Sequence, residues 1–248
     1  MLARGEGDGV RRRATRRWRP VLGISLAALG LWIGYEAWTW PNVASLAGRH
    51  PTTTAFIADY RRAQRAAGRD DHVAWSWTPY PAISPHLKRA VLVAEDINFF
   101  AHHGFDVGEI RTALGQALEE GEAPRGASTI TQQLAKNLWL SPSRNPLRKL
   151  KEAALTWQLE RTLGKRRILE LYLNVAEFGP GVYGVGAASR RYFGKSSGEL
   201  DEADAARLAA SLPNPAAWHP GSPSRTYERH VATIQRRMAK ATFLRNLI

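Results

Sequence analysis

Hydrophobic residues recur at helical spacing along most of this chain. In SPHLKRAVLVAED, the apolar face includes Leu87, Ala90 and Ala94. Ser84 and Pro85 are residues suited to begin such a helix. Strict alternation of apolar and polar residues, the pattern of a half-buried strand, is rare. The pattern therefore predicts a mainly α fold.

The same spacing predicts further helices, separated by segments rich in glycine, proline and serine. Thr129 and Gln132 are spaced as a capping box, with Ser128 as an alternative cap. Residues 119–128 are expected to form a loop, and the glycine-rich residues 179–196 to form turns before a short helix. The other predicted helices are 51–68, 128–140, 147–164, 165–178, 201–212 and 225–244.

The N-terminus has a different pattern. The first twenty residues hold seven arginines, and no charged residue occurs from Pro20 to Tyr35. Twenty residues at about 1.5 Å each span a hydrocarbon core of about 30 Å, so we expect a transmembrane anchor with its basic end in the cytoplasm. The alternatives are a cleaved signal peptide, with SLA at 45–47 as a weak cleavage site, and a buried helix. The predicted organisation is a basic cytoplasmic tail (1–20), the anchor (21–40), a polar connector (41–80) and one domain (81–248).

Composition narrows the class of protein. Hydrophobic residues make up 44% of the 248 residues, enough for a packed core and too many for a wholly disordered chain. The net charge of +13 favours an anionic partner, such as a nucleic acid, a phospholipid surface or a phosphorylated substrate. The chain has no cysteine, which excludes disulfides and thiolate metal sites but does not identify the compartment.

Two adjacent acids, Glu95 and Asp96, stand at the end of the first helix described above. The helix dipole disfavours acids at this end, so their position needs a reason. They are surface acids, a catalytic pair, or metal ligands together with His102, His103 and Asp106. The spacing of these five residues matches no standard zinc pattern, which makes the metal site the weakest of the three hypotheses.

Other short motifs have an ordinary structural explanation when taken alone. Arg148 and Glu152 are four residues apart and can form a surface ion pair on a helix. GKS at 194–196 lacks the earlier glycine of a phosphate-binding loop, because Ser189 occupies that position. RRYFGK and the basic C-terminal helix could be nucleic-acid patches, but their aromatic residues do not interleave with the basic ones as a base-stacking platform requires, which argues against nucleic acid.

Together, the motifs are far more specific than any one of them. EDINFFAHHG fits the pattern E-D-x-x-F-x-x-H-x-G, and GASTITQQLAKN, RKLKE, KRRILELYLN and LPNP follow in that order. This succession resembles the peptidoglycan glycosyltransferases, the transglycosylase module of class A penicillin-binding proteins and of monofunctional enzymes. The resemblance covers about residues 80–220, with one departure at Ala127, where a second glycine is commoner. No S-x-x-K motif occurs, so we expect the monofunctional biosynthetic form, without a transpeptidase half.

The resemblance implies a lysozyme-like, mostly helical domain with a small membrane-facing lobe. It also implies polymerisation of lipid II, in which the GlcNAc 4-hydroxyl attacks C1 of the growing chain with inversion and undecaprenyl pyrophosphate leaves. Glu95 would be the general base, and Glu152 the second essential glutamate. The substrate-binding or pyrophosphate-binding positions would be Asp96, Ser128, Gln132, Gln133, Lys136, Arg144 and Arg148. The supporting positions of the motifs would be Phe99, His102, Gly104, Glu170 and Asn174.

The resemblance assigns no metal ligands, and it allows a divalent cation, Mg²⁺ or Mn²⁺, at the pyrophosphate. The expected partners are lipid II, the growing glycan chain, membrane lipids and other cell-wall synthesis or division proteins, without nucleic acid. We expect a single-pass protein of the inner membrane, with the catalytic domain on the periplasmic side. Two alternatives stay open: a lysozyme-like muramidase or lytic enzyme, and a membrane-tethered module that binds anionic polymers.

Overall fold

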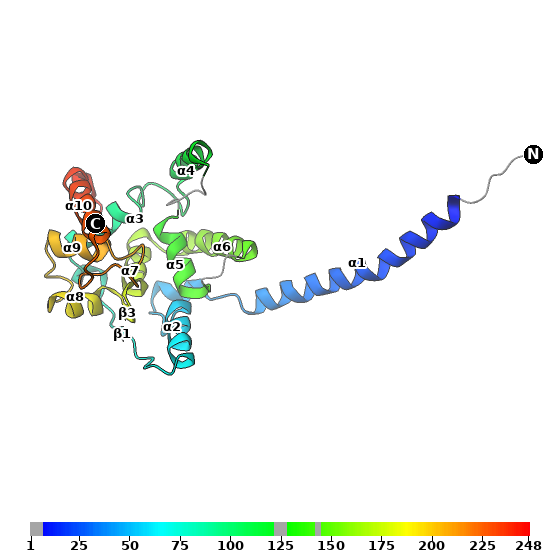
Figure 1. Cartoon of the computed structure of the whole chain (residues 1–248), viewed down its shortest axis with the longest axis horizontal. Coiled ribbons are helices and arrows are strands. Elements are labelled where there is room, and N and C mark those ends of the chain that lie inside the picture. Colours follow the sequence, from blue (N-terminus) through cyan, green and yellow to red (C-terminus); the bar gives the residue numbers. More distant parts are fainter. Residues whose placement is uncertain (1–6, 122–127, 142–144) are drawn as a thin grey trace, which may run out of the picture. The chain divides into compact units, whose positions relative to one another are not determined.

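The computed structural model describes the backbone of residues 7–121, 128–141 and 145–248 (Figure 1). Side chains are described from residue 22 onward within these ranges, except for Glu120. The chain divides into two compact units, Met1–Asn42 and Val43–Ile248. Helices make up most of the described elements, so the predicted mainly α fold class is confirmed.

The first unit contains one helix, α1, from Gly7 to Trp38. Its described side chains include exposed apolar groups such as those of Leu22, Ile24 and Trp38. Across the described part of the chain, no helix combines the length and the apolar character needed to cross a membrane. The helix agrees with the pattern of residues 21–40, whereas the membrane anchor stays a prediction.

The second unit combines helices with one small sheet. Its α-helices are α2 (Ala55–Ala66), α3 (Pro85–Glu95), α4 (Val107–Glu120), α5 (Ile130–Trp139), α6 (Pro146–Thr162), α7 (Lys165–Val175), α8 (Val185–Phe193), α9 (Glu202–Ala209) and α10 (Arg225–Lys240). Its 3₁₀ helices are η1 (Val43–Ala47), η2 (Tyr80–Ala82) and η3 (Thr242–Asn246). Its strands are β1 (Ala74–Trp75), β2 (Glu177–Gly179) and β3 (Val182–Tyr183).

The helix α3 begins as its sequence predicts. The Ser84 side chain accepts a hydrogen bond from the backbone N–H of His86, and Pro85 occupies the first turn. All residues from Leu87 to Val93 are buried, because α3 packs against both α9 and α10. The helix α5 packs in turn against α6 and α7. These two sets of contacts fix the C-terminal end of α3 and the N-terminal end of α5, between which the site lies.

The sequence pattern does not predict the three-stranded sheet. Its order is β1-β3-β2, with β1 parallel to β3 and β2 antiparallel to it. The strands are only two or three residues long, so no alternation can be recognised in the sequence. The sheet joins the segment before α3 to the glycine-rich segment after α7.

Residues 43–80, which we expected to be a connector, contribute η1, α2 and β1 to the second unit. Thr54 caps α2 by accepting a hydrogen bond from the N–H of Ile57, as the amphipathic pattern of residues 51–68 predicts. Ile57 is fully buried and packs in one cluster with Val73 and Tyr183. The segment differs from a connector because its few apolar side chains are buried against the rest of the unit.

Candidate active site

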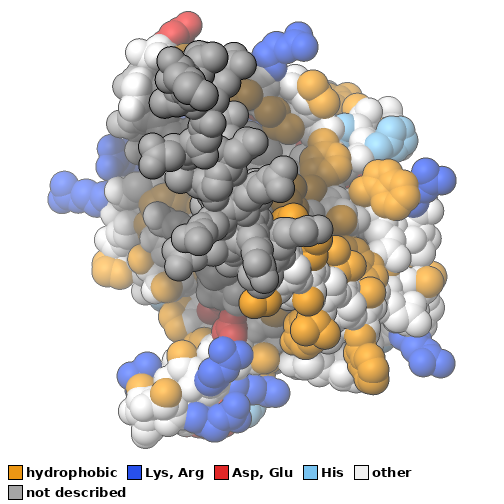
Figure 2. All heavy atoms as spheres, turned by 90° about the vertical axis from the view of Figure 1, so that its right-hand side faces the viewer, with side chains coloured by type: hydrophobic (Ala, Val, Ile, Leu, Met, Phe, Trp, Pro, Cys, Tyr) orange, Lys and Arg blue, Asp and Glu red, His pale blue; other side chains and the backbone are white. Residues whose placement is uncertain are grey.

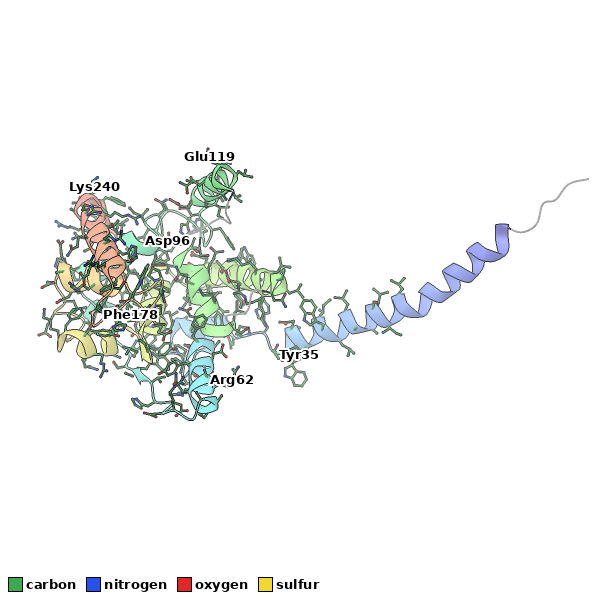
Figure 3. All side chains as sticks on the ribbon, viewed as in Figure 1. Tyr35, Arg62, Asp96, Glu119, Phe178 and Lys240 are labelled. Carbon is green, nitrogen blue, oxygen red and sulfur yellow. The ribbon has the colours of Figure 1, made fainter. Side chains whose placement is uncertain are left out.

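The helix α3 ends at Glu95, and the backbone leaves the helical region at Asp96, where φ is −165° and ψ is 78°. Asp96 is labelled in Figure 3. Glu95 is half-buried, and the Asp96 side chain is only 3% exposed. The two acids therefore lie at the helix exit, as predicted, but they are not solvated surface groups. Their unfavourable position relative to the helix dipole has to be offset by specific contacts.

Asp96 receives hydrogen bonds from two other segments. The backbone N–H of Ile130, the first residue of α5, donates to Asp96 Oδ2 at 3.0 Å. The ring nitrogen Nε2 of His102 lies 2.9 Å from Asp96 Oδ1. A carboxylate at a helix N-terminus is stabilised by the dipole and by the free N–H groups there. Asp96 therefore joins the end of α3 to the start of α5, and both of its oxygens are occupied.

The rest of the motif supports this contact. The backbone N–H of Gly104 donates to His102 Nδ1 at 3.1 Å, so the ring proton lies on Nε2 and is donated to Asp96. Gly104 has a φ of +90°, and a Cβ there would lie 2.9 Å from Cγ2 of Thr156. Phe99 is fully buried, with its ring edge-on to His102 at a centroid distance of 6.3 Å. These residues shape the loop that holds Asp96.

Glu95 has a neutral hydrogen-bond partner. Gln133 Nε2 donates to Glu95 Oε2 at 2.6 Å, and the Tyr172 hydroxyl donates to Gln133 Oε1 at 3.0 Å. Burial raises the pKa of Glu95, and the bond from Gln133 and the charge of Lys136 offset this only in part. A half-buried carboxylate with a raised pKa and one neutral donor is a candidate proton acceptor.

Glu95 and Asp96 line a cavity of about 230 Å³, which we name the Glu95 cavity. The backbone N–H of Glu109 and the side chain of Asn98 donate to Asp106 and hold its pKa below its usual range. Walls rich in acceptors suit a ligand with many hydroxyl donors, such as a sugar. The lining residues are Ala94, Glu95, Asp96, Ile97, Asn98, Asp106, Glu109, Ser128, Thr129 and Arg237.

A second carboxylate, that of Glu152 in α6, has charged partners. Its side chain is 3% exposed, and Arg148 Nη1 lies 2.9 Å from Glu152 Oε2. The Lys149 ammonium group pairs with the other oxygen, Oε1. The predicted pair of Arg148 and Glu152 is therefore confirmed, but it is buried on the glutamate side. We name Arg148, Lys149 and Glu152 the Glu152 cluster. The i,i+3 spacing within RKLKE could have identified Lys149.

Lys136 of α5 interacts electrostatically with both carboxylates, Glu152 and Glu95. Burial lowers the pKa of Lys136. Its ammonium group lies 5.7 Å from the centroid of the Phe56 ring, a cation–π contact. Arg144, the remaining predicted basic residue, lies outside the described residues. Lys136 and the Glu152 cluster thus form a basic region, of which Lys136 acts electrostatically on Glu95.

The start of α5 combines capping with cavity lining. Thr129 is the N-cap, and the capping box is confirmed, because Gln132 Oε1 accepts from the N–H of Thr129 at 3.0 Å. The Thr129 hydroxyl donates to the carbonyl of Gly104 at 2.7 Å. Gln132 is buried, and its contact with substrate stays a prediction. Ser128 is exposed and lines the Glu95 cavity.

The two supporting motif positions on α7, Glu170 and Asn174, lie away from the Glu95 cavity. Asn174 is fully buried, and its side chain donates to the carbonyl of Thr78 at 2.8 Å and accepts from the Thr78 N–H at 2.7 Å. Glu170 Oε2 lies 2.9 Å from Arg167 Nη1. Neither Asn174 nor Glu170 belongs to the described lining of the Glu95 cavity. Asn174 holds the segment before α3 against α7.

Sequence reasoning did not single out Arg237 of α10 or Tyr172 of α7. Arg237 lines the Glu95 cavity and lowers the pKa of Glu95 through its charge. The helix α10 carries several arginines, and their spacing gives no sign of which one reaches a cavity formed by distant segments. Tyr172 stands within a predicted helix, where a buried tyrosine has no visible role before its partner is known.

The residues present do not fit a cation held by the protein alone. Among the described residues, no group of three or more His, Asp and Glu side chains is arranged to bind a metal ion. Both oxygens of Glu152 face basic side chains, and both oxygens of Asp96 accept hydrogen bonds. Glu152 therefore pairs with basic side chains among the described residues.

Comparison with known proteins agrees with this geometry. Residues 41–239 match the family model described as Transglycosylase. The chain is 45% identical over 221 residues to the "Biosynthetic peptidoglycan transglycosylase" of Thiobacillus denitrificans, with 89% of this chain and 95% of that protein covered. Proteins of the same description from Methylobacillus flagellatus and Azoarcus sp. are 42% and 43% identical, each match covering 90% of this chain and 96% of the relative. The chain therefore belongs to the transglycosylase family, the peptidoglycan glycosyltransferases that its motifs resemble, and it is an enzyme.

Proposed function

We propose that this enzyme polymerises lipid II into glycan strands. The growing chain passes from undecaprenyl pyrophosphate to the GlcNAc 4-hydroxyl of lipid II. A bond forms between that oxygen and C1 of the donor, the bond from C1 to the phosphate oxygen breaks, and the configuration at C1 inverts. The hydroxyl proton passes to a base on the enzyme, and the electron pair leaves with the pyrophosphate. The supporting observation is the presence of a neutrally partnered acid, Glu95, within electrostatic range of Lys136.

In this proposal Glu95 is the general base. An alcohol is a weak nucleophile, so a positioned group has to accept its proton as the new bond forms. The raised pKa of Glu95 makes its ionised form a stronger base than an ordinary glutamate. Asp96 is less suited to this task, because both of its oxygens already accept hydrogen bonds. Asp96 instead positions the end of α3, and the lining of the Glu95 cavity receives the acceptor sugar.

The basic region receives the leaving pyrophosphate. Lys136, Arg148 and Lys149 provide positive charge where negative charge develops in the transition state. Arg148 Nε is buried and has no acceptor among the described residues. Glu152 holds Arg148 and Lys149 in place. A divalent cation that takes part would be bound by the pyrophosphate itself.

A lysozyme-like arrangement with a membrane-facing lobe belongs to the same proposal. The helix α4 exposes Leu114 and Leu118, and α6 exposes Leu150 and Trp157. Exposed hydrophobic side chains are also visible on the face drawn in Figure 2. Exposed apolar patches mark surfaces that bind membranes or partners. Replacing Leu150 and Trp157 with glutamate should raise KM for lipid II with a long lipid chain. An equal rise for a short-chain analogue would contradict this role.

We also propose that residues 21–40 anchor the protein in the inner membrane, with the N-terminus in the cytoplasm. The support is the arginine-rich start, the uncharged stretch that follows it, and the exposed apolar side chains of α1. Protease added outside intact spheroplasts should digest the second unit. A mature protein that begins near Gly48 would overturn the anchor.

The direct test supplies labelled lipid II in detergent to the full chain. We expect glycan chains that lengthen with time. A parallel incubation with purified glycan polymer separates the main alternative, because a lysozyme-like lytic enzyme would shorten the polymer. A binding module for anionic polymers would give no product from either substrate. Absence of chains from lipid II, under conditions where a known glycosyltransferase makes them, would refute the proposed reaction.

A further inference from the structure

Tyr172 stands behind the residues that line the Glu95 cavity. Its side chain is 1% exposed, and its hydroxyl donates to Gln133 Oε1 at 3.0 Å. Gln133 Nε2 donates in turn to Glu95 Oε2 at 2.6 Å. The three side chains belong to α7, α5 and the end of α3. They form a chain of hydrogen bonds that ends on the proposed base, which we name the Tyr172 relay.

The direction of the relay follows from its first donor. Burial, together with the charges of Glu95 and Asp96, raises the pKa of Tyr172 well above its ordinary value, so the phenol stays protonated. A phenol that donates to Gln133 fixes the amide oxygen toward Tyr172 and the amide nitrogen toward Glu95. The opposite amide orientation would set two acceptors, Gln133 Oε1 and Glu95 Oε2, against each other at hydrogen-bond distance.

We infer that Tyr172 is a positioning residue, whose hydroxyl orients the Gln133 amide so that this amide donates to Glu95 and fixes one carboxylate oxygen. This inference rests on the proposed role of Glu95 as the base. It adds a buried residue, outside the described lining of the Glu95 cavity, on which the alignment of the base depends.

The relay has a consequence for pH dependence. The bond from Gln133 lowers the pKa of Glu95 against the larger effect of burial. The other charged groups that act on Glu95 are Lys136 of α5 and Arg237 of α10, which lower its pKa, and Asp96, which raises it. These groups all remain when only the Tyr172 hydroxyl is removed. Without that hydroxyl, the Gln133 amide loses the hydrogen bond that its oxygen accepts, so it is held less firmly as a donor to ionised Glu95, and the base is protonated more easily as the pH falls.

The test compares Tyr172→Phe with the wild-type full chain, using labelled lipid II. We expect kcat on the plateau of the pH profile to fall about 3- to 10-fold, the effect of one hydrogen bond. We expect KM to be unchanged and the acidic limb of the profile to move to higher pH. Tyr227→Phe is the matched control, since Tyr227 is 0% exposed and its hydroxyl donates to the Arg207 carbonyl at 2.8 Å. The control should keep the wild-type profile.

A double-mutant cycle with Gln133→Met tests whether Tyr172 acts through the amide. In the Gln133→Met background, Tyr172→Phe should cause no further change in kcat. Equal effects in both backgrounds, or an unmoved acidic limb in Tyr172→Phe, would overturn the relay. Should Tyr172→Phe not fold, Gln133→Met alone must still move the limb, and an unmoved limb overturns the relay.

The outcomes also separate the relay from the proposed function. If Glu95→Gln keeps its activity, Glu95 is not the base, and the Tyr172 relay then has no catalytic group to position. If Glu95→Gln is inactive while Tyr172→Phe matches the wild type in kcat and in pH profile, the proposed function stands and only the relay fails.

Discussion

Glu95 and Glu152 are two carboxylates with opposite surroundings. Glu95 accepts a hydrogen bond from a neutral amide, that of Gln133, and lines a cavity. Glu152 is almost fully buried, and Arg148 and Lys149 occupy both of its oxygens. An acid with a cavity beside it can meet the hydroxyl of a substrate, whereas an acid paired with two cations is suited to hold those cations in place.

In the proposed reaction, this difference gives each acid its own task. A transfer from a pyrophosphate carrier requires a base for the incoming hydroxyl and positive charge for the departing phosphates. Cations placed directly against the proposed base would compete with the substrate hydroxyl for its carboxylate. The chain keeps the two tasks apart, and Lys136 interacts with both Glu95 and Glu152 across the distance between them.

The largest expected effect comes from removing the proposed base, Glu95, while the surroundings of Glu152 stay unchanged. Glu95→Gln retains size and hydrogen bonding but cannot accept the proton, so turnover should fall by about 10² to 10⁴. Thermal stability should be kept, because burial already disfavours the charged form of Glu95. Initial rates of glycan formation and thermal melts would check this. Rates within a few-fold of the wild type would mean that Glu95 is not the base.

The next prediction concerns the basic residues near Glu152 and their proposed role in stabilising the leaving pyrophosphate. Lys136→Ala should lower polymerisation by about 10² to 10³, the typical cost of losing one group that stabilises charge in the transition state. Lys240→Ala, which alters an exposed lysine at the end of α10, is the matched control and should keep the wild-type rate. Equal rates in the two variants, with unchanged circular dichroism, would remove Lys136 from the site.

A third prediction concerns stability and should distinguish the two acids directly. Glu152→Gln leaves Arg148 and Lys149 without their counter-charge, and the free energy of unfolding should fall by about 2 kcal/mol. This is less than the usual cost for a fully buried pair, because Lys149 is more than half exposed. Denaturant unfolding of Glu152→Gln beside Glu95→Gln would measure the difference. Equal losses of stability would show that the two surroundings do not differ in the way described.

The last effect lies away from both acids, outside the proposed chemistry, and depends on pH. Burial raises the pKa of Glu177 to about 7, whereas an unfolded glutamate has a pKa near 4.5. Because the folded protein holds this proton more tightly than the unfolded chain, protonated Glu177 contributes stability. This contribution is complete below about pH 4.5 and is lost as the pH rises through about 7. Glu177→Gln should therefore stabilise the protein by up to about 3 kcal/mol at pH 8, and by nothing below pH 4.5. A gain that is independent of pH would show that Glu177 does not titrate with folding.

The local parts of the fold could be predicted because they depend on neighbouring residues. Ser84 and Pro85 begin α3, and the capping box begins α5, since caps join residues only two or three positions apart. The short strands and the packing of residues 43–80 were not predicted. Their hydrogen bonds and buried contacts are made with segments that are distant in the sequence.

By itself, the sequence determined that this protein is mainly helical, that it belongs to the transglycosylase family, and that Glu95, Asp96 and Glu152 belong to its motifs. Only the tertiary structure decided what each acid contacts. Glu95 and Gln133 are 38 residues apart, Asp96 and Ile130 are 34 apart, and Arg237 comes from the last α-helix. Spacing along a helix fixes contacts over one turn, whereas these contacts depend on how α3, α5, α7 and α10 pack. That packing gives Glu95 a neutral donor and Glu152 two cations, and so assigns different chemistry to side chains of the same type.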